Sequence, residues 1–282
     1  MKLPNRTHND SPTGGEESNK VIKVHEEVGH SSNMIHRNET LEDRETHVEI
    51  AQAFDLLDFN NASKLTGHKF VMFKNEAALL ELAVCNWALN LVAKKGFTAV
   101  TPPDLARQQI VDACGFQPRD DASQIYHLEG KNECLIGTAE IPLAGMYANE
   151  IVDKSRLTHK MVAFSHCFRA EAGRGQHSHG LYRLHQFSKV EMLGLTEGHT
   201  DDSEALLKEF VDIQEEIVQQ LDLKYRILDM ASEELGAAAY RKFDIEAWIP
   251  SKRSYGEICS ASNCTSYQSR RLNINYFDGQ NQ

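Results

Sequence analysis

The sequence of 282 residues lacks several features that would assign it to a special class of protein. It has no uninterrupted run approaching the roughly 18 apolar residues of a membrane-spanning helix. Its N-terminus lacks the charged and then apolar pattern of a secretory signal. Its six cysteines include no CxxC pair and no histidines at the spacing of a zinc site. We therefore expect a soluble intracellular protein with reduced, mostly buried cysteines.

An excess of positive charge is also absent, because the formal net charge is -11. Proteins that bind nucleic acid through phosphate contacts usually carry a basic surface, so the whole surface of this chain does not suit RNA. A local basic patch, or another segment, would have to supply such binding. The content of 41% hydrophobic and 25% charged residues fits a globular chain with a sizeable core.

The chain divides by composition near residue 45. Residues 1–45 are polar and rich in turn formers, which predicts a linker or N-terminal segment, and its acidic residues make it a poor mitochondrial targeting peptide. Residues 46–282 are expected to form the core domain. At its start, apolar residues at helical spacing predict a helix over 76–94 with a broad buried stripe, followed by a short strand that ends before Pro102-Pro103.

Alternating apolar and polar residues dominate the second half of the chain, with one helical stretch between them. The pattern predicts a long hairpin and further strands, with Asp201-Asp202-Ser203 as the helix cap. We expect an α+β fold in which helices flank a mostly antiparallel sheet. The expected elements are strands over 161–171 and 181–195, a helix over 202–221, and strands over 243–248 and 255–260.

The second strand of this hairpin carries polar and aromatic side chains of one parity. These residues are Arg183, His185, Phe187, Lys189 and Glu191. Such a face could bind a nucleotide, because a ring can stack on a base, a guanidinium can pair with phosphate, and a carboxylate can accept from an ammonium or hydroxyl group. The alternative is a solvated sheet face with cross-strand ion pairs. Spacing alone leaves both interpretations open.

Several sequence segments resemble motifs of class II seryl-tRNA synthetases. Residues 167–173 and 180–191 resemble motif 2, and Thr138-Ala139-Glu140 resembles the serine-binding element. Residues 256–265 resemble the metal and ATP strand, and the helix and strand before Pro102-Pro103 resemble motif 1, which forms the family's dimer interface. The segment Leu3-Pro4-Asn5-Arg6-Thr7-His8 is similar to the mitochondrial and plant-organelle branch.

The resemblance implies a serine-tRNA ligase that converts serine and ATP, with Mg²⁺, to seryl-adenylate and transfers serine to tRNA(Ser). It also implies a homodimer through the motif 1 region, no membrane association and a mitochondrial, or otherwise a cytoplasmic, location. Arg169 and Glu257 are the implied catalytic residues. Implied ATP contacts are Arg169, Glu171, Arg183, Leu184, Phe187, Glu257 and Ser260. Implied serine contacts are Thr138, Glu140, Arg169 and Glu191, and the implied Mg²⁺ ligands are Glu257 and Ser260.

The chain also departs from the family pattern. Glu257 and Ser260 have opposite parity on a strand, so a bulge, a bend or a backbone contact is required to bring both to one ATP. Cys259 replaces the usual serine, and Ser266 replaces a common aspartate. Neither the N-terminal helical arm nor motif 3 is found, which predicts a truncated product with impaired activity. Two alternatives are a catalytically silent synthetase-like protein with a dimerisation or regulatory role, and another ATP-using amide- or ester-forming enzyme.

Overall fold

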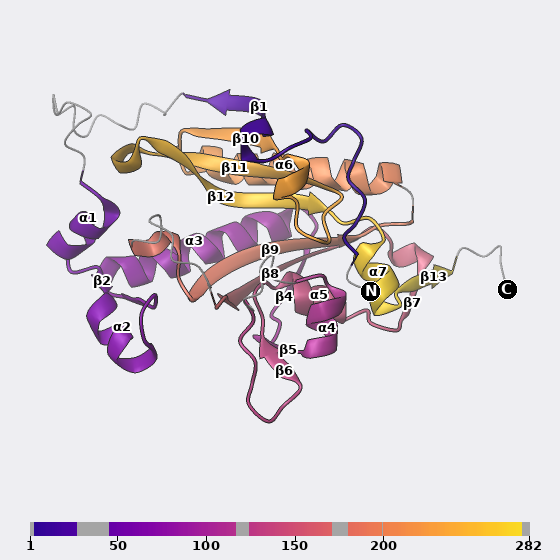
Figure 1. Cartoon of the computed structure of the whole chain (residues 1–282), viewed down its shortest axis with the longest axis horizontal. Helices are drawn as coiled ribbons and strands as arrows, with labels where there is room; N and C mark the ends of the chain where they lie inside the picture. The colour runs from indigo at the N-terminus through magenta and orange to yellow at the C-terminus, as the bar shows by residue number, and fades with distance from the viewer. Residues whose placement is uncertain (1–2, 27–44, 117–123, 171–179, 199, 278–282) are drawn as a thin grey trace. The chain divides into compact units, whose positions relative to one another are not determined.

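The computed structural model describes residues 3–26, 45–116, 124–170, 180–198 and 200–277 (Figure 1). The chain forms two compact units, which we describe separately. Unit 1 combines residues 1–46 with 198–267, and unit 2 combines residues 47–197 with 268–282. The composition change near residue 45 therefore lies beside the first break between units.

Unit 1 is a four-stranded antiparallel sheet with one long helix. The strand order is β1-β10-β11-β12. The helix packs on the sheet through a core that includes Val218, Tyr225, Ile227 and Ile245. The elements are η1 (Glu16–Ser18), β1 (Lys20–His25), α6 (Thr200–Gln220), β10 (Tyr225–Asp229), η5 (Ser232–Glu234), β11 (Arg241–Ile249), η6 (Pro250–Lys252) and β12 (Ser254–Asn263).

Strand β1 was not expected in a segment that we interpreted as a linker. It pairs with β10, and Lys23 Nζ lies 2.6 Å from Glu215 Oε1 of α6. Its apolar residues Val21, Ile22 and Val24 remain about half exposed. The strand therefore depends on pairing and ion contacts with distant residues, and it has no buried face that alternation in the sequence could reveal.

Unit 2 contains the predicted long hairpin. Strands β8 and β9 pair antiparallel, and β4 pairs parallel with β8. Residues 180–182 form a 3-10 turn, so β9 begins at Gln186 and the predicted start at Leu181 was wrong. The helices are α1 (His47–Ala53), α2 (Phe59–Thr66), α3 (Asn75–Lys94), α4 (Gln108–Ala113), α5 (Glu140–Gly145) and α7 (Tyr267–Leu272), with 3-10 turns η3 (Lys154–Arg156) and η4 (Gly180–Tyr182). The strands are β2 (Leu57–Asp58), β3 (Met72–Phe73), β4 (Thr98–Val100), β5 (Leu105–Arg107), β6 (Glu133–Leu135), β7 (Ile151–Asp153), β8 (His159–Phe168), β9 (Gln186–Leu195) and β13 (Asn275–Phe277).

Helix α3 confirms the predicted helix but not its buried stripe. Leu79, Leu80 and Leu82 are 69%, 63% and 62% exposed, and only Ala88 and Val92 are buried. In the part of the chain that the structure describes, this helix alone is long and apolar enough to cross a membrane by length and composition. Core helices and signal sequences share that property. The stripe was predicted as core because periodicity identifies an apolar face without identifying what covers it.

The structure agrees with the prediction for the cysteines and shifts the predicted start of one helix. The six cysteines are free thiols, and Cys114, Cys134 and Cys167 are buried. Helix α6 begins at Thr200, so Asp201-Asp202-Ser203 forms its first turn and does not precede it. Within that turn, Ser203 Oγ accepts a hydrogen bond of 3.0 Å from Asn263 Nδ2 at the end of β12.

Candidate active site

The hairpin of unit 2 places several predicted residues on one face. Cys167 pairs with Phe187, Ser165 with Lys189, and Ala163 with Glu191. Alternate residues of a strand project to the same side, so Phe187, Lys189 and Glu191 of β9 share a face. The residues paired with them on β8 project to that side as well. This confirms the parity that the sequence predicted for these three side chains.

A network of hydrogen bonds joins Thr138 to this face. Thr138 is buried just before α5, and its Oγ1 donates to Glu191 Oε2 at 2.5 Å. The same Oγ1 accepts from the backbone N–H of Glu140 at 3.2 Å and from Lys189 Nζ at 2.8 Å. Lys189 also forms an ion pair with Glu191 Oε2. Two implied serine contacts, Thr138 and Glu191, thus meet, together with Lys189, for which we expected no role.

Glu140 lies beside this network and has a partner that sequence reasoning missed. Gln268 Nε2 from α7 donates to Glu140 Oε1 at 2.5 Å and contacts the carbonyl oxygen of Cys114 at 3.2 Å. Burial, and then the negative charge of Glu191, raise the pKa of Glu140, while Gln268, Lys189 and Arg169 oppose the rise. No local signal connects two residues that lie 128 positions apart.

Arg169 follows β8 and packs between aromatic rings. Its guanidinium carbon lies 5.1 Å from the ring centre of Phe187 and 5.8 Å from that of Phe116. Its Nε donates to the carbonyl oxygen of Gly137 at 3.3 Å, and its backbone N–H donates to that of His185 at 2.9 Å. Two implied ATP contacts, Phe187 and Arg169, therefore lie against each other.

Three other predicted ATP contacts of this region have different surroundings. Arg183 is exposed between η4 and β9. Leu184 is buried, with 7% of its surface exposed. Glu171 lies outside the described residues, so its implied contact with ATP stays a prediction.

In unit 1, a β-bulge in β12 brings Glu257 and Ser260, which have opposite parity in the sequence, to one face of the sheet. Ile245 pairs with Cys259, but the next residue on β11, Glu246, pairs with Glu257, so β12 has one extra residue at Ile258. The extra residue reverses the alternation, which places Glu257 and Ser260 on the same face of the sheet. Of the three possibilities that the sequence left open, a bulge, a bend or a backbone contact, the structure has the bulge.

Asp244 on β11 shares that face, because it pairs directly with Ser260. Its Oδ2 accepts from Lys242 Nζ at 2.7 Å, while its buried Oδ1 has no hydrogen-bond partner. Burial, followed by the charge of Glu257, raises the pKa of Asp244 from 3.8 to about 6.

These oxygens fit Mg²⁺ in type and number. Among the described residues, no group of three or more His, Cys, Asp or Glu side chains could hold a metal ion. Mg²⁺ commonly uses only one or two protein carboxylates and completes its shell with water and substrate phosphates. Glu257 and Ser260, with the orphaned carboxylate oxygen of Asp244 on the same face, suit an ion of that kind.

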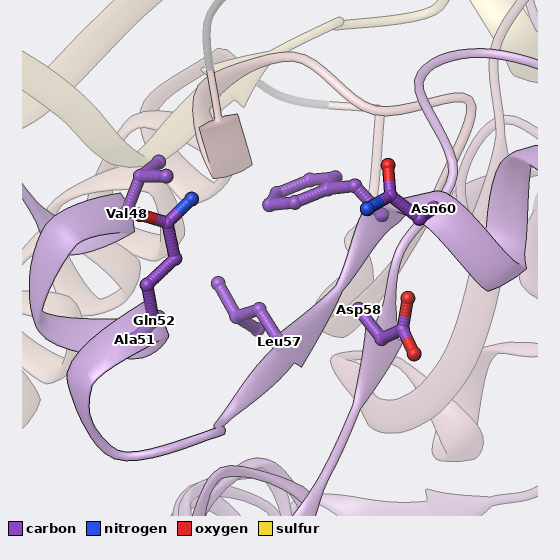
Figure 2. A pocket seen from close by; sticks show the side chains of 7 residues that line it. Val48, Ala51, Gln52, Leu57, Asp58 and Asn60 are labelled. Carbon is purple, nitrogen blue, oxygen red and sulfur yellow. The ribbon is translucent and has the colours of Figure 1, made fainter.

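Two cavities in unit 2 contain none of the predicted residues. The first, of about 180 Å³, is shown in Figure 2 and is lined by Val48, Ala51, Gln52, Leu57, Asp58, Phe59 and Asn60. The second, of about 300 Å³, is lined by Arg107, Gln109, Asn132 and Glu133. Asp58, the only carboxylate at the first cavity, already accepts the Asn61 N–H at 2.8 Å as the N-cap of α2. The network around Thr138 and Glu191 is therefore the stronger candidate for chemistry.

Comparisons with known proteins identify the family of this chain. Residues 126–282 match the family model described as tRNA synthetase class II core domain (G, H, P, S and T). The chain belongs to this family. The α+β core that the sequence predicted is thereby confirmed.

Individual relatives make the likeness more specific. The serine–tRNA ligase of Borrelia garinii subsp. bavariensis is 51% identical over 241 residues, which cover 83% of this chain and 56% of that protein. The serine–tRNA ligase of Borrelia recurrentis is 47% identical over 287 residues, covering 99% of this chain and 65% of that protein. The chain thus spans 56% to 65% of the length of these relatives.

Solved structures give the same result. The seryl-tRNA synthetase of Pyrococcus horikoshii complexed with ATP has a TM-score of 0.90 and 36% identity, covering 100% of this chain and 65% of that one. The cytoplasmic serine-tRNA ligase of Naegleria fowleri in complex with AMP has a TM-score of 0.87 and 28% identity, covering 99% of this chain and 65% of that one. These comparisons give no support to the organellar sub-type.

Proposed function

We propose that this chain carries the amino-acid-activating site of a serine–tRNA ligase. In this reaction the serine carboxylate attacks the α-phosphate of ATP, pyrophosphate leaves, and the seryl-adenylate then passes serine to tRNA(Ser). The observation that carries the proposal is the network of Thr138, Lys189, Glu191 and Glu140, which gathers paired carboxylates in a family that forms aminoacyl-adenylates. The relatives named above are serine–tRNA ligases, which supports serine as the substrate.

Recognition of serine requires partners for an ammonium group and a hydroxyl group. In our proposal Glu140 pairs with the ammonium group, and Glu191 accepts from the hydroxyl group. Alanine has no hydroxyl and would leave a desolvated acceptor on Glu191 unpaired, at a cost of about 1 to 3 kcal/mol.

Positioning and charge stabilisation account for the chemical step, because adenylate formation by in-line displacement requires no protein nucleophile. The planar guanidinium of Arg169 suits both the α-phosphate and the serine carboxylate. Glu171, Phe187, Arg183 and Leu184 are the proposed contacts of the nucleotide. Glu257 and Ser260 would hold Mg²⁺, which neutralises phosphate charge when it is bound.

Serine-dependent exchange of pyrophosphate into ATP tests this proposal without requiring tRNA. We expect exchange with serine and much slower exchange with alanine or threonine. Glu191→Gln should reduce the serine kcat/KM at least about tenfold, because a neutral amide replaces a charged acceptor. Glu197→Gln, just beyond the same strand and paired with Lys154, is the matched control. Exchange that depends on another amino acid would refute the assignment to serine.

We also propose that α3 forms the interface of a homodimer. Its exposed leucines make an apolar surface on one protomer, and a second copy would cover it with the same surface. Membrane insertion is the competing explanation, but Glu81 of this helix accepts a hydrogen bond of 2.6 Å from Ser188 of β9, which anchors the helix in its unit.

Light scattering tests the dimer. The chain should have twice the protomer mass, and Leu79→Lys combined with Leu82→Lys should return it to the protomer mass. A monomer at micromolar concentration, or co-sedimentation with lipid vesicles, would contradict the proposal. A dimer without pyrophosphate exchange would favour the silent synthetase-like alternative.

The organellar sub-type and the mitochondrial location are proposals that rest on sequence motifs alone. The segment Leu3-Pro4-Asn5-Arg6-Thr7-His8 is the reason for proposing an organellar sub-type and a mitochondrial location. Imaging of the tagged gene product in its own cell tests this, and exclusive cytoplasmic fluorescence would overturn it. Charging of tRNA(Ser), compared with a non-cognate tRNA, tests the nucleic-acid partner.

A further inference from the structure

The hydroxyl group of Thr138 uses its full hydrogen-bonding capacity on partners within the protein. A threonine hydroxyl has one proton to donate and two lone pairs to accept. Its proton goes to Glu191 Oε2, and its lone pairs accept from the Glu140 N–H and from Lys189 Nζ. Thr138 therefore acts on its neighbours in the protein.

The two oxygens of Glu191 have different surroundings. Oε2 accepts from Thr138 Oγ1 and also contacts the Lys189 ammonium. Both interactions fall on the same oxygen, so they fix the rotation of the carboxylate about its terminal bond. Oε1 is then the oxygen that remains for a hydroxyl group of a bound amino acid.

Charge makes Lys189 central to this arrangement. Glu191 and Glu140 are close enough for Glu191 to raise the pKa of Glu140, and two neighbouring carboxylates disfavour joint ionisation. Lys189 and Arg169 are the cations that act against this effect. The Lys189 side chain is also only 31% exposed, so water screens its charge only in part.

We propose that Lys189 determines the specificity of this site for a hydroxyl-bearing amino acid, because it holds Oε2 of Glu191 and leaves Oε1 as the substrate acceptor. Thr138 is a positioning residue, because its Oγ1 donates to the same oxygen of Glu191 that Lys189 holds directly. This inference rests on the proposed function and assigns to Lys189 a part in it. A lysine that only stabilises the fold would lower the affinity for every ligand of the site to the same degree.

Binding of two adenylate analogues separates these cases without requiring turnover. The probes are 5′-O-(N-seryl)sulfamoyl-adenosine and its alanyl counterpart, which differ by one hydroxyl group. Titration calorimetry with the full 282-residue chain gives both Kd values. We expect the unaltered chain to prefer the seryl probe by about tenfold to a hundredfold, as one hydrogen bond to a charged acceptor implies.

Lys189→Met should abolish this preference, so that the ratio of the two Kd values falls to about one. Loss of a cation near Glu140 acts on both probes alike and leaves that ratio unchanged. Lys189→Arg should restore most of the preference because it keeps the charge. Lys131→Met, at an exposed turn lysine, is the matched control and should change neither Kd. Thr138→Val has the same shape without the hydroxyl and should weaken the preference less than Lys189→Met does, because Lys189 still holds Oε2.

The outcomes separate the two claims. If the unaltered chain binds neither probe, or does not prefer the seryl probe, the proposed function is wrong and this inference with it. If the unaltered chain prefers the seryl probe and Lys189→Met keeps that preference, the inference alone is wrong. If Lys189→Met fails to fold by circular dichroism, Lys189→Gln decides, because it also removes the charge, and a retained preference in that variant overturns the inference.

Discussion

Asp244 allows a stability prediction with a defined sign and size. Its side chain is only 4% exposed, and its pKa is raised from 3.8 to about 6, first by burial and then by Glu257. Lys242 opposes the rise but does not cancel it. Asp244→Asn keeps the shape of the side chain and removes the charge, so it isolates the cost of an ionised carboxylate at this position.

The magnitude follows from linkage between protonation and folding. The folded state binds the proton more tightly than the unfolded state, so the contribution of this group to the free energy of unfolding falls as the pH rises from about 4 to about 6, and stays constant above that range. Two units of pKa correspond to roughly 3 kcal/mol. The attraction of Lys242 is already contained in that shift. We therefore expect Asp244→Asn to be nearly neutral at pH 4 and stabilising by roughly 3 kcal/mol at pH 7.

Urea unfolding at several pH values between 4 and 7 measures this difference. The unaltered chain and the variant should have equal m values, so that the change lies in the free energy of unfolding and not in the surface exposed. Asp212→Asn, at an exposed position of α6, is the control and should show no such pH-dependent gain. A variant that is less stable than the unaltered chain at pH 7 would refute the reasoning.

Three further predictions concern other contacts. Burial raises the pKa of Glu215, but contacts with Lys23 and Tyr225 outweigh it, so the pKa is lowered on balance. The charge of Glu215 therefore stabilises the fold above pH 4.5, and this stabilisation is lost as the pH falls below that value. Glu215→Gln should reduce the loss of thermal stability on acidification. Gly137→Ala would place a Cβ 2.3 Å from Phe116 Cζ, so it should slow pyrophosphate exchange at least about tenfold by displacing the ring beside Arg169. Gln268→Leu removes a buried donor and should lower the free energy of unfolding by about 1 to 3 kcal/mol in urea titrations.

The amino-acid sequence by itself determined the elements with a strong period. Alternation over β8 and β9 predicted the hairpin and the shared face of Phe187, Lys189 and Glu191, because a strand has a period of two whatever surrounds it. For the same reason, the opposite parity of Glu257 and Ser260 indicated an irregularity, a bulge, a bend or a backbone contact, and the structure has a bulge there. Short sequence motifs were also sufficient to suggest the family that the comparison with known proteins then confirmed.

Only the tertiary structure decided how these side chains use their hydrogen bonds. Thr138 and Glu191 are 53 positions apart, and Glu140 and Gln268 are 128 positions apart, so neither pairing has a local signal. The exposure of Leu79 in α3 has a similar cause, since a helical period reveals an apolar face but not its cover. Periodicity is set by backbone geometry, which the sequence expresses locally, whereas the partners of a donor or an apolar face depend on which distant segments the fold brings into contact.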